Sequence, residues 1–424
     1  MKKYSLLIFS MMVMFAANAQ FTITSSSEHL LLSDQQYNID AIALFNSIPP
    51  DAELNYTGGG NFMWSYTIAG ETYTSTQMSV MPENGVLYTI MINGVATYYV
   101  YVIDYSLYPV TCSGVTVDAD NPDVCVVTDI DVAVNPADIT YTDRNGNVRS
   151  LQRSFYVAYT TAGWDAANST WVDSAVTVSS PIAGNHVRVQ VPAILQDGLV
   201  AAYGDNFAVD MGLPIDTCYA DFYATAVQAH PTGTVIERDA KNEKDRSSQT
   251  AIQGSAPLVV QLKANPNPLS NVFVEWFIWN INDSNAFLRF ADETVNYTFE
   301  ETGDYKAKVV VRNDKCSYTE TLNIKTLESF IEVPNVFTPN DDGINDEFRV
   351  AYKSIKEYHI WIYNRWGRLV YKSTDPAKGW DGRINGKPAS VGTYYYIINA
   401  YGEDTNDKGK RVHYKLSGDC NLLR

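Results

Sequence analysis

The chain has 424 residues and a formal net charge of −17, which disfavours nucleic acid as a partner because neutralising phosphates requires a basic face. Its length is too great for one small core and predicts three or four domains. The 29 tyrosines and frequent Val, Ile and Thr, with little of the Ala, Leu, Glu and Lys mixture that builds long helices, predict an all-β protein of tandem Ig-like β-sandwich domains.

Residues 1–19 predict a secretory signal peptide. Lys2 and Lys3 precede an apolar run, and the small residues Ala17-Asn18-Ala19 follow it. The run is shorter than the ~20 residues that cross a bilayer. We therefore expect export and cleavage between Ala19 and Gln20.

The sequence predicts two successive β domains, residues 20–111 and residues 112–236. The first is predicted to be an Ig-like sandwich. In the first, the stretch YYVYVIDYS alternates at period two, which indicates a half-buried strand. In the second, Asn145-Gly146 stands between ITYT and VRSL, and both residues accept the positive φ angles of a type I′ turn. We expect a tight hairpin at this position.

Five cysteines are an odd number for an exported chain, so at least one stays unpaired or pairs between molecules. Cys112 and Cys125 flank the turn-rich stretch SGVTVDADNPDV and are the predicted disulfide. The alternative is that all five are separate buried thiols, because free Cys is often part of a core. The five are Cys112, Cys125, Cys218, Cys316 and Cys420.

Two segments of contrasting pattern follow. Residues 237–253 include ERDAKNEKDRSSQT, which is highly charged, lacks apolar periodicity and predicts a linker. Residues 254–328 alternate as strands, and Gly303 before Tyr305 fits the corner where a Tyr turns the chain into a late strand of an Ig-like sandwich. This spacing resembles the polycystic-kidney-disease-type (PKD-like) Ig domain, although Trp279–Asp283 stands where that family has a W-x-F-G-D-G segment.

Residues 331–424 differ from the rest of the chain in charge and motifs. They carry 14 Lys and Arg against 12 Asp and Glu, a net +2, whereas the remainder carries −19. Four motifs follow one another: VPNVFTPNDDGINDEF, IYNRWGRLVYKS, GWDGRINGKPASVGTYYYIINAYG and GDCNLLR. In this order they resemble the gliding-motility-associated C-terminal domain, the type B sorting domain of the type IX secretion system. The resemblance implies a small Ig-like sandwich that directs an exported passenger across the outer membrane and is not an enzyme.

Several residues of these motifs have a structural role that can be predicted from their chemistry. Asn364–Gly367 is predicted to be a hairpin turn whose Trp366 is expected to cap the sandwich edge. Asp381 is expected to accept backbone hydrogen bonds in its own turn. Cys420 stands where the family has an apolar residue, so we expect it to be the unpaired, buried thiol. The motif residues are Pro339, Asn340, Asp342, Gly343, Asn345, Asp346, Asn364, Trp366, Gly367, Trp380, Asp381, Gly382, Gly392 and Tyr394.

The acid-rich stretch TPNDDGINDE raises the question of a metal loop. An EF-hand with Gly343 as its sixth residue would put Arg349 where a bidentate Glu is needed, which excludes it. Turns in which side-chain oxygens accept nearby N–H groups are favoured. A catalytic carboxylate set is disfavoured because it needs a cleft and a matched partner. A looser calcium loop is the alternative, with the oxygen ligands Asn340, Asp342, Asn345 and Asp346.

Aromatic clusters occur in several predicted strands, among them FMWSY, YYVYV and VEWFIW. They could line a face that binds a glycan or peptide. Alternate residues of a strand face opposite ways, so only about half of each cluster can be exposed. A core role is favoured, because Trp and Phe are routine at the centre of Ig-like sandwiches.

The signatures GxSxG, HExxH and GxxxxGK[ST] do not occur, and we expect no catalytic residues and no cofactor. The predicted function is that of a secreted cell-surface protein, exported by the type IX system, whose N-terminal Ig-like modules serve adhesion, binding or structural display. The expected partners are the type IX machinery, an outer-membrane anchoring protein and an extracellular glycan or protein ligand. The alternative is a secreted hydrolase acting on glycans or peptides, with its site in residues 112–236.

Overall fold

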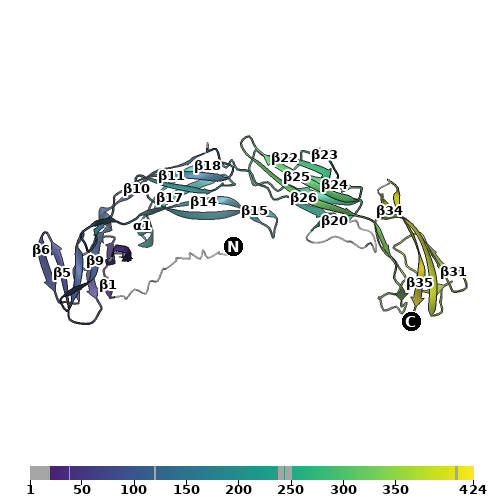
Figure 1. Ribbon diagram of the computed structural model, residues 1–424, viewed down its shortest axis with the longest axis horizontal. Coiled ribbons are helices and arrows are strands. Elements are labelled where there is room, and N and C mark those ends of the chain that lie inside the picture. The colour runs from purple at the N-terminus through teal and green to yellow at the C-terminus, as the bar shows by residue number, and fades with distance from the viewer. Residues whose placement is uncertain (1–19, 38, 119–120, 237–242, 244–250, 406–408) are drawn as a thin grey trace. The chain divides into compact units, whose positions relative to one another are not determined.

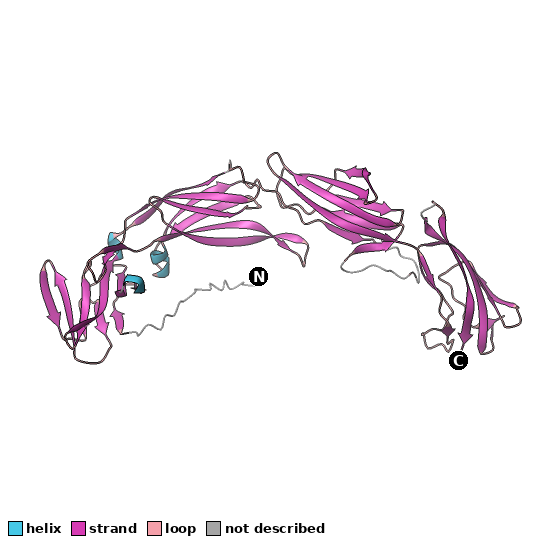
Figure 2. Ribbon diagram, in the orientation of Figure 1, coloured by secondary structure: helices cyan, strands magenta, loops and turns pink. Residues whose placement is uncertain are grey.

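The computed structural model describes residues 20–37, 39–118, 121–236, 243, 251–405 and 409–424. Strands dominate these residues, as Figure 2 shows, and the predicted all-β class of tandem β-sandwiches is confirmed. Helical structure in the described chain is short: η1 (Gln35–Tyr37), η2 (Tyr105–Leu107) and α1 (Asn206–Asp210). The chain divides into two compact units: Met1–Thr161 with Asp173–Tyr223, and Ala162–Val172 with Ala224–Arg424. Figure 1 labels many of the strands.

The first unit begins with two sheets that share one core. The smaller sheet has the order β1-β4-β7, formed by β1 (Phe21–Thr24), β4 (Glu53–Tyr56) and β7 (Ser79–Val80). The larger sheet has the order β2-β3-β9-β8-β5-β6, formed by β2 (His29–Asp34), β3 (Ile39–Phe45), β9 (Val95–Asp104), β8 (Leu87–Ile92), β5 (Phe62–Ile68) and β6 (Glu71–Ser75).

Trp64 lies at the centre of this core and is fully buried. Its ring centroid is 6.2 Å from that of Tyr88 and 6.3 Å from that of Phe21, and its indole N–H donates to the carbonyl of Gln77 at 3.0 Å. Period-two alternation along β5 and β8 directs the rings of Trp64 and Tyr88 to one side of the larger sheet, whereas Phe21 comes from β1 of the smaller sheet. The FMWSY cluster thus contributes its Trp to the core.

Three more sheets follow, which lie in the first unit except where their strands include residues of Ala162–Val172. One has the order β10-β11-β16, formed by β10 (Val110–Asp118), β11 (Val127–Pro136) and β16 (His186–Pro192). A second has the order β15-β14-β17-β18, formed by β15 (Thr170–Pro181), β14 (Ser154–Asp165), β17 (Gly198–Gly204) and β18 (Asp216–Phe222). The third pairs β12 (Thr140–Thr142) with β13 (Val148–Ser150).

The hairpin predicted at Asn145-Gly146 is present, but its turn type is different. The last strand pair is Thr142 with Val148, so five residues connect the strands. Of the two central residues only Gly146 has a positive φ, at 82°, whereas a type I′ turn needs positive φ at both. The Asp143 carboxylate fixes the loop instead, by accepting the N–H groups of Asn145 and Asn147, each at 2.9 Å.

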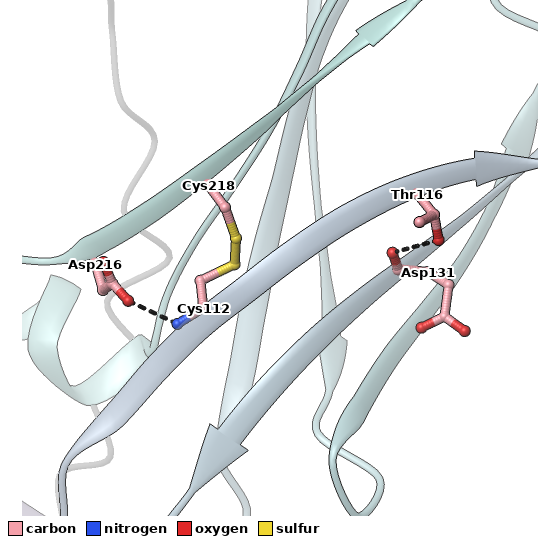
Figure 3. The surroundings of a disulfide bond; sticks show 5 residues. All are labelled: Cys112, Thr116, Asp131, Asp216 and Cys218. Atoms are coloured by element: carbon pink, nitrogen blue, oxygen red, sulfur yellow. Dashed lines mark hydrogen bonds between the residues drawn. A yellow bond between two sulfur atoms is a disulfide. The ribbon is translucent and has the colours of Figure 1, made fainter.

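The predicted disulfide between Cys112 and Cys125 is wrong, because Cys112 pairs with Cys218 across 106 positions of sequence. The Asp216 carboxylate accepts the backbone N–H of Cys112 at 2.6 Å, which holds β10 beside β18 (Figure 3). Sequence proximity favoured the local pair, whereas the sandwich brings two distant strands together. Cys125 and Cys316 are also in the disulfide form.

A buried ion pair lies inside the first unit, beside a second hydrophobic cluster that includes Ile42, Tyr141 and Phe207. Arg153 donates to the Asp205 carboxylate, and the two residues are 4% and 0% exposed. Asp205 also accepts the Tyr105 hydroxyl at 2.7 Å and, as the N-cap of α1, the N–H of Ala208 at 3.1 Å.

The Arg153 guanidinium of this ion pair also donates to the backbone carbonyl of Ala137 at 2.6 Å. Each charge therefore has several hydrogen-bond partners inside the protein, which is the condition under which a buried pair is tolerated.

The second unit contains a sandwich made of two sheets. One has the order β19-β21-β24, formed by β19 (Thr232–Val235), β21 (Leu258–Lys263) and β24 (Thr294–Phe299). The other has the order β20-β26-β25-β22-β23, formed by β20 (Ile252–Ser255), β26 (Ser317–Leu327), β25 (Gly303–Arg312), β22 (Phe273–Asn280) and β23 (Asp283–Phe290). Within the predicted linker, residues 237–242 and 244–250 lie outside the described chain, and Ile252 and Gln253 belong to β20.

The tyrosine corner predicted in this sandwich is confirmed. The Tyr305 hydroxyl donates to the carbonyl of Glu301 at 3.1 Å, and Gly303 has a φ of 151°. Beyond this corner Ala307, Val309 and Val311 are fully buried, so the alternation of β25 places every second residue in the core.

The last strands of the second unit build another sandwich. Its main sheet has the order β28-β35-β34-β30-β31, formed by β28 (Val336–Phe337), β35 (Arg411–Leu422), β34 (Gly392–Thr405), β30 (Ile355–Tyr363) and β31 (Leu369–Ser373). Two short pairs complete it: β27 (Phe330–Glu332) with β29 (Ala351–Lys353), and β32 (Arg383–Ile384) with β33 (Lys387–Pro388). No helix in the described part of the chain is long and apolar enough to cross a membrane.

Candidate functional site

Three of the four motifs in residues 331–424 come together in space. Strand β28 of the first motif pairs in parallel with β35 of the last, with Val336 opposite Asn421 and Phe337 opposite Leu422. The third motif joins them through Trp380, whose backbone exchanges hydrogen bonds with Phe348 at 2.9 and 3.0 Å. We call this convergence the motif cluster.

Trp380 is the centre of the motif cluster and is 1% exposed. Its ring lies 5.4 Å from that of Phe337 and 4.8 Å from that of Tyr394, so it touches both the first and the third motif. The indole N–H donates to the carbonyl of Arg383 at 2.8 Å. A large ring with its polar N–H satisfied stabilises the packing of these two motifs against each other.

Gly382 is required at its position for two independent reasons. Its φ is +70°, and a Cβ there would lie 2.8 Å from the Pro339 ring and 3.1 Å from the Leu422 side chain. The Arg424 guanidinium then closes the cluster by donating to the carbonyls of Gly382 at 3.2 Å and Ala389 at 3.0 Å. Only a residue without a side chain lets the three segments approach this closely.

The remaining residues of the third motif form local turns. The Asp381 carboxylate accepts the N–H of Arg383 at 3.0 Å, as predicted. Gly392 opens β34 with a φ of 139°, and the Tyr394 hydroxyl donates to the carbonyl of Ser390 at 2.9 Å. These bonds fix the direction in which β34 leaves the motif cluster.

The acidic loop, Pro339–Asp346, is organised by carboxylates that accept backbone N–H groups. Asp346 accepts those of Asn340 at 3.0 Å, Asp341 at 2.8 Å and Gly343 at 2.8 Å. The carbonyl of Asn345 accepts the N–H of Thr338 at 2.8 Å, which closes the loop. The favoured interpretation, a turn held by side-chain oxygens, matches this geometry.

Asp342 is bonded in the same way on the outer part of the loop. It accepts the amide of Asn340 at 2.8 Å and the N–H of Ile344 at 2.7 Å, and these bonds lower the pKa of its carboxyl. Because the folded pKa is lowered, the stabilisation is present above the ordinary value of 3.8 and is lost as the pH falls through the lowered value.

Calcium binding by Asn340, Asp342, Asn345 and Asp346 stays a prediction. Within the described residues, no three His, Cys, Asp or Glu side chains are grouped so that they could hold a metal ion. A calcium ion would have to compete with N–H donors for the oxygens of Asp342 and Asp346. Calorimetry with millimolar calcium tests this: absence of heat and an unchanged melting temperature would contradict it.

Replacing Asp346 with alanine should destabilise the acidic loop by about 1–2 kcal/mol, because three backbone N–H groups lose a charged acceptor. Hydrogen exchange of the peptide that covers Asn340–Gly343 measures this as faster exchange. Asp341→Asn is the matched control, since it removes a carboxylate from the same loop and keeps the Asp346 bonds. Equal exchange in both variants would contradict the role given to Asp346.

The hairpin of the second motif lies between β30 and β31. The Asn364 side chain accepts the N–H groups of Trp366 at 3.1 Å and Arg368 at 3.0 Å, and Gly367 has a φ of 76°. The expectation that Trp366 caps the sandwich edge is wrong, because its side chain is 75% exposed. Its ring instead carries the Arg365 guanidinium at 4.2 Å, and the turn directs both outward.

Cys420 is the free thiol of the chain and is fully buried, as predicted. Burial and the neighbouring Asp419 carboxylate raise the pKa of its thiol to about 12. At neutral pH the group is therefore a protonated, inert part of the core.

A thiol titration checks this assignment. Without reductant, a disulfide-exchange reagent should find no reactive thiol in the native chain at pH 8 and one per chain in denaturant. In Cys420→Ala the denatured signal should disappear. A native chain that reacts at once would contradict the burial of Cys420.

The region assigned to the alternative hydrolase contains a depression of about 580 Å³ on the β10-β11-β16 sheet. Asp129 and Asp131 line it, together with Asp118 from β10. Asp131 contacts His186 at 2.8 Å and Arg188 at 3.3 Å, and Asp129 accepts from Gln190 at 3.0 Å. Asp129 and Asp131 on β11 therefore contact side chains of the neighbouring strand β16 on the surface of one sheet.

The predicted cleavage site has one residue in the described chain. Ala19 lies outside the described residues, whereas the carbonyl of Gln20 accepts the N–H of Thr57 at 2.8 Å.

Comparison with known proteins identifies the class of two segments in this tandem β-sandwich chain. Residues 331–413 match the CHU_C type IX secretion signal domain, and residues 116–219 match a fibronectin type III domain. The chain therefore carries a type IX secretion signal domain with a fibronectin type III domain before it. This signal implies that the type IX machinery handles the chain and that it is exported to a secreted or cell-surface location.

Two solved structures illustrate the wider likeness. The tetra-tandem repeat in the extending region of a large adhesion protein is 9% identical, with 95% of this chain and 99% of that chain covered and a TM-score of 0.21. Three N-terminal domains of the bacteriophage RB49 Hoc protein are 10% identical, with 74% and 98% covered and a TM-score of 0.23. At these values neither carries an argument. No curated protein matches the sequence significantly.

The sequence patterns missed two features of these segments. The fibronectin type III segment was expected only as a β domain without a family. The part played by Arg424 in the motif cluster was also not predicted, because a single cation at the end of a motif gives no sign of the carbonyls that it contacts.

Proposed function

We propose that this exported chain is a cell-surface protein whose modules before residue 331 serve adhesion, binding or structural display. The observation that carries the proposal is the motif cluster in the sandwich of residues 331–424. The polar motif residues of this sandwich form hydrogen bonds that hold its own loops. The described sandwiches before it have cores of buried residues that include Trp64 and Trp276.

Binding or display is favoured over hydrolysis by the arrangement in residues 112–236. A general acid or base works in a cleft that shifts its pKa and holds it beside the substrate. The Asp131 pair with His186 and Arg188 lies on a sheet surface, where the three side chains are between 35% and 80% exposed. Exposed pairs of this kind are common on strands and contribute little energy.

Maturation and attachment are part of the same proposal. Signal peptidase is expected to cleave between Ala19 and Gln20, and mass spectrometry of the mature N-terminus tests this. After crossing the outer membrane, the chain is expected to associate with an outer-membrane anchoring protein. Crosslinking on intact cells, followed by identification of the product, tests the second step.

A transfer experiment tests the sorting role. Residues 331–424 are fused behind a signal peptide and a reporter, in a bacterium that has the type IX system. We expect the reporter at the cell surface in that strain and in the periplasm of a strain that lacks the secretion machinery. A reporter that stays in the periplasm of both strains, although the fusion is stable, would overturn the proposal.

A further inference from the structure

The outer face of the β20-β26-β25-β22-β23 sheet combines aromatic rings with cations. Strand β22 turns Trp276 and Ile278 into the core and therefore presents the alternate residues outward. Two of the outward rings are strongly exposed: Phe273 at 58% and Phe287 at 55%. The outward rings, here called the ring row, are Phe273, Phe277, Trp279 and Phe287.

A row of cations on the neighbouring strand β25 lies opposite the ring row. The strand register pairs Phe273 with Arg312, Phe277 with Lys308, and Trp279 with Lys306. Residues paired in this way have Cβ atoms about 4.5–5.5 Å apart. The three cations, here called the cation row, are thus Lys306, Lys308 and Arg312.

Contacts between the two rows position two of the three cations. The Lys308 ammonium is 5.0 Å from the Phe277 ring centroid, and the Arg312 guanidinium is 5.6 Å from that of Phe273. Phe277 and Phe287 lie 5.7 Å apart, so the rings continue onto β23. A ring holds a cation in place without cancelling its charge, unlike a carboxylate.

The charge of this face is opposite to that of the chain. Glu275 on β22 is an outward acid, and it pairs with Arg289 and, at 3.7 Å, with Arg312. Asp304 pairs with Lys325 at 3.8 Å at the far end of the face. On the outer face of these paired strands, five cations therefore stand against two acids, on a chain of net charge −17. The cations are Arg289, Lys306, Lys308, Arg312 and Lys325.

We propose that this face binds an acidic polysaccharide, in which apolar sugar-ring faces and carboxylates alternate. The proposal rests on the extracellular binding role proposed above and gives that role a ligand class. Sugar rings stack on the ring row, and their carboxylates pair with the cation row, whose Arg312 offers a bidentate fork. Exposed apolar side chains on a surface rimmed by charge mark an interaction site, and the excess of positive charge selects an anion.

A uronate polymer fits this face better than nucleic acid does. Duplex DNA carries one charge per ~1.7 Å of its axis, so the remaining acidic surface of the chain would repel it strongly. A uronate polymer carries at most one charge per sugar, and its rings provide the apolar faces that the ring row needs.

The test measures binding of the full purified chain to polygalacturonate by affinity electrophoresis and calorimetry. An uncharged β-glucan and single-stranded DNA are run in parallel. We expect the chain to bind polygalacturonate, with an affinity that falls as the salt concentration is raised. The β-glucan and the single-stranded DNA should bind at least tenfold more weakly. Equal binding of the β-glucan would overturn the role of charge, and equal binding of DNA would overturn the polysaccharide assignment.

Two surface variants separate the contributions. The triple change Lys306→Gln, Lys308→Gln, Arg312→Gln should lower the affinity at least tenfold and reduce its salt dependence. The double change Phe273→Ala, Phe287→Ala should lower the affinity at least fivefold and leave the salt dependence unchanged. An affinity equal to that of the wild type in both variants would overturn the proposal.

The matched control is Arg365→Gln with Trp366→Ala, which removes another exposed cation and ring from the chain. It should bind polygalacturonate like the wild type, and circular dichroism and melting temperatures establish that all variants fold. A loss of affinity equal to that of the triple variant would show nonspecific attraction and overturn the proposal.

Failure of this inference can be told apart from failure of the proposed function. Surface display of the wild-type chain on cells is measured with an antibody, independently of any glycan. If the chain is displayed but does not bind polygalacturonate, only the ligand assignment is wrong. If the chain never reaches the surface, the proposed function is wrong whatever the purified protein binds.

Discussion

Replacing Trp380 with alanine should lower the free energy of opening of residues 331–424 by about 3–5 kcal/mol and keep the chain from reaching the cell surface. Loss of a fully buried Trp leaves a cavity of this energetic size. Here the cavity lies where Phe337, Tyr394 and the carbonyl of Arg383 all contact the lost side chain. The first and third motifs would lose their common contact at once.

Hydrogen exchange on the full chain measures this effect segment by segment, since each opening unit reports its own free energy. A change of 3–5 kcal/mol appears as a drop of more than a hundredfold in protection of β28, β34 and β35. Protection in the first unit should stay unchanged. Wild-type protection throughout residues 331–424 would contradict the role of Trp380.

Trp366→Ala is the matched control, because it removes the same side chain from an exposed turn. Its effect on stability should stay within about 0.5 kcal/mol. If this variant folds but no longer reaches the surface, Trp366 contacts the secretion machinery. If it is exported normally, recognition depends on other parts of the domain. Comparison of the two variants thus separates folding from recognition.

Replacing Arg153 with alanine should destabilise the first unit by about 3–5 kcal/mol, because the Asp205 carboxylate would stay buried without its counter-charge. Asp205 keeps the Tyr105 hydroxyl and the Ala208 N–H, which do not neutralise it. Tyr105→Phe removes one hydrogen bond and should cost about 1 kcal/mol. Urea denaturation of the full chain, with hydrogen exchange of β14 and β17, measures both.

The exposed pair between Arg188 and Asp131 provides the matched control in the same unit. The Arg188 side chain is 80% exposed, and Arg188→Ala should change stability by less than about 1 kcal/mol. An equal loss of stability in Arg153→Ala and Arg188→Ala would contradict the prediction that breaking the buried Arg153–Asp205 pair costs more than breaking an exposed pair.

Local patterns predicted the strands and several turns correctly. The alternation of apolar residues predicted β25, in which Ala307, Val309 and Val311 are buried. The spacing of Gly303 and Tyr305 predicted the tyrosine corner. The burial of Cys420 was predicted from the resemblance to the sorting-domain family, which has an apolar residue at this position. These features depend on side-chain periodicity and on contacts a few residues apart, which the sequence records directly.

The sequence by itself determined the all-β class, the export module and the acids that shape its own loop. The tertiary structure decided which cysteine faces Cys112, because its partner Cys218 lies 106 positions away on β18, which packs beside β10. It also decided the different fates of two tryptophans beside turn glycines. Trp380 meets Phe337 and Tyr394 and is buried, whereas Trp366 stands at a hairpin tip with no core behind it. Burial depends on neighbours from distant strands, and no local pattern carries that information.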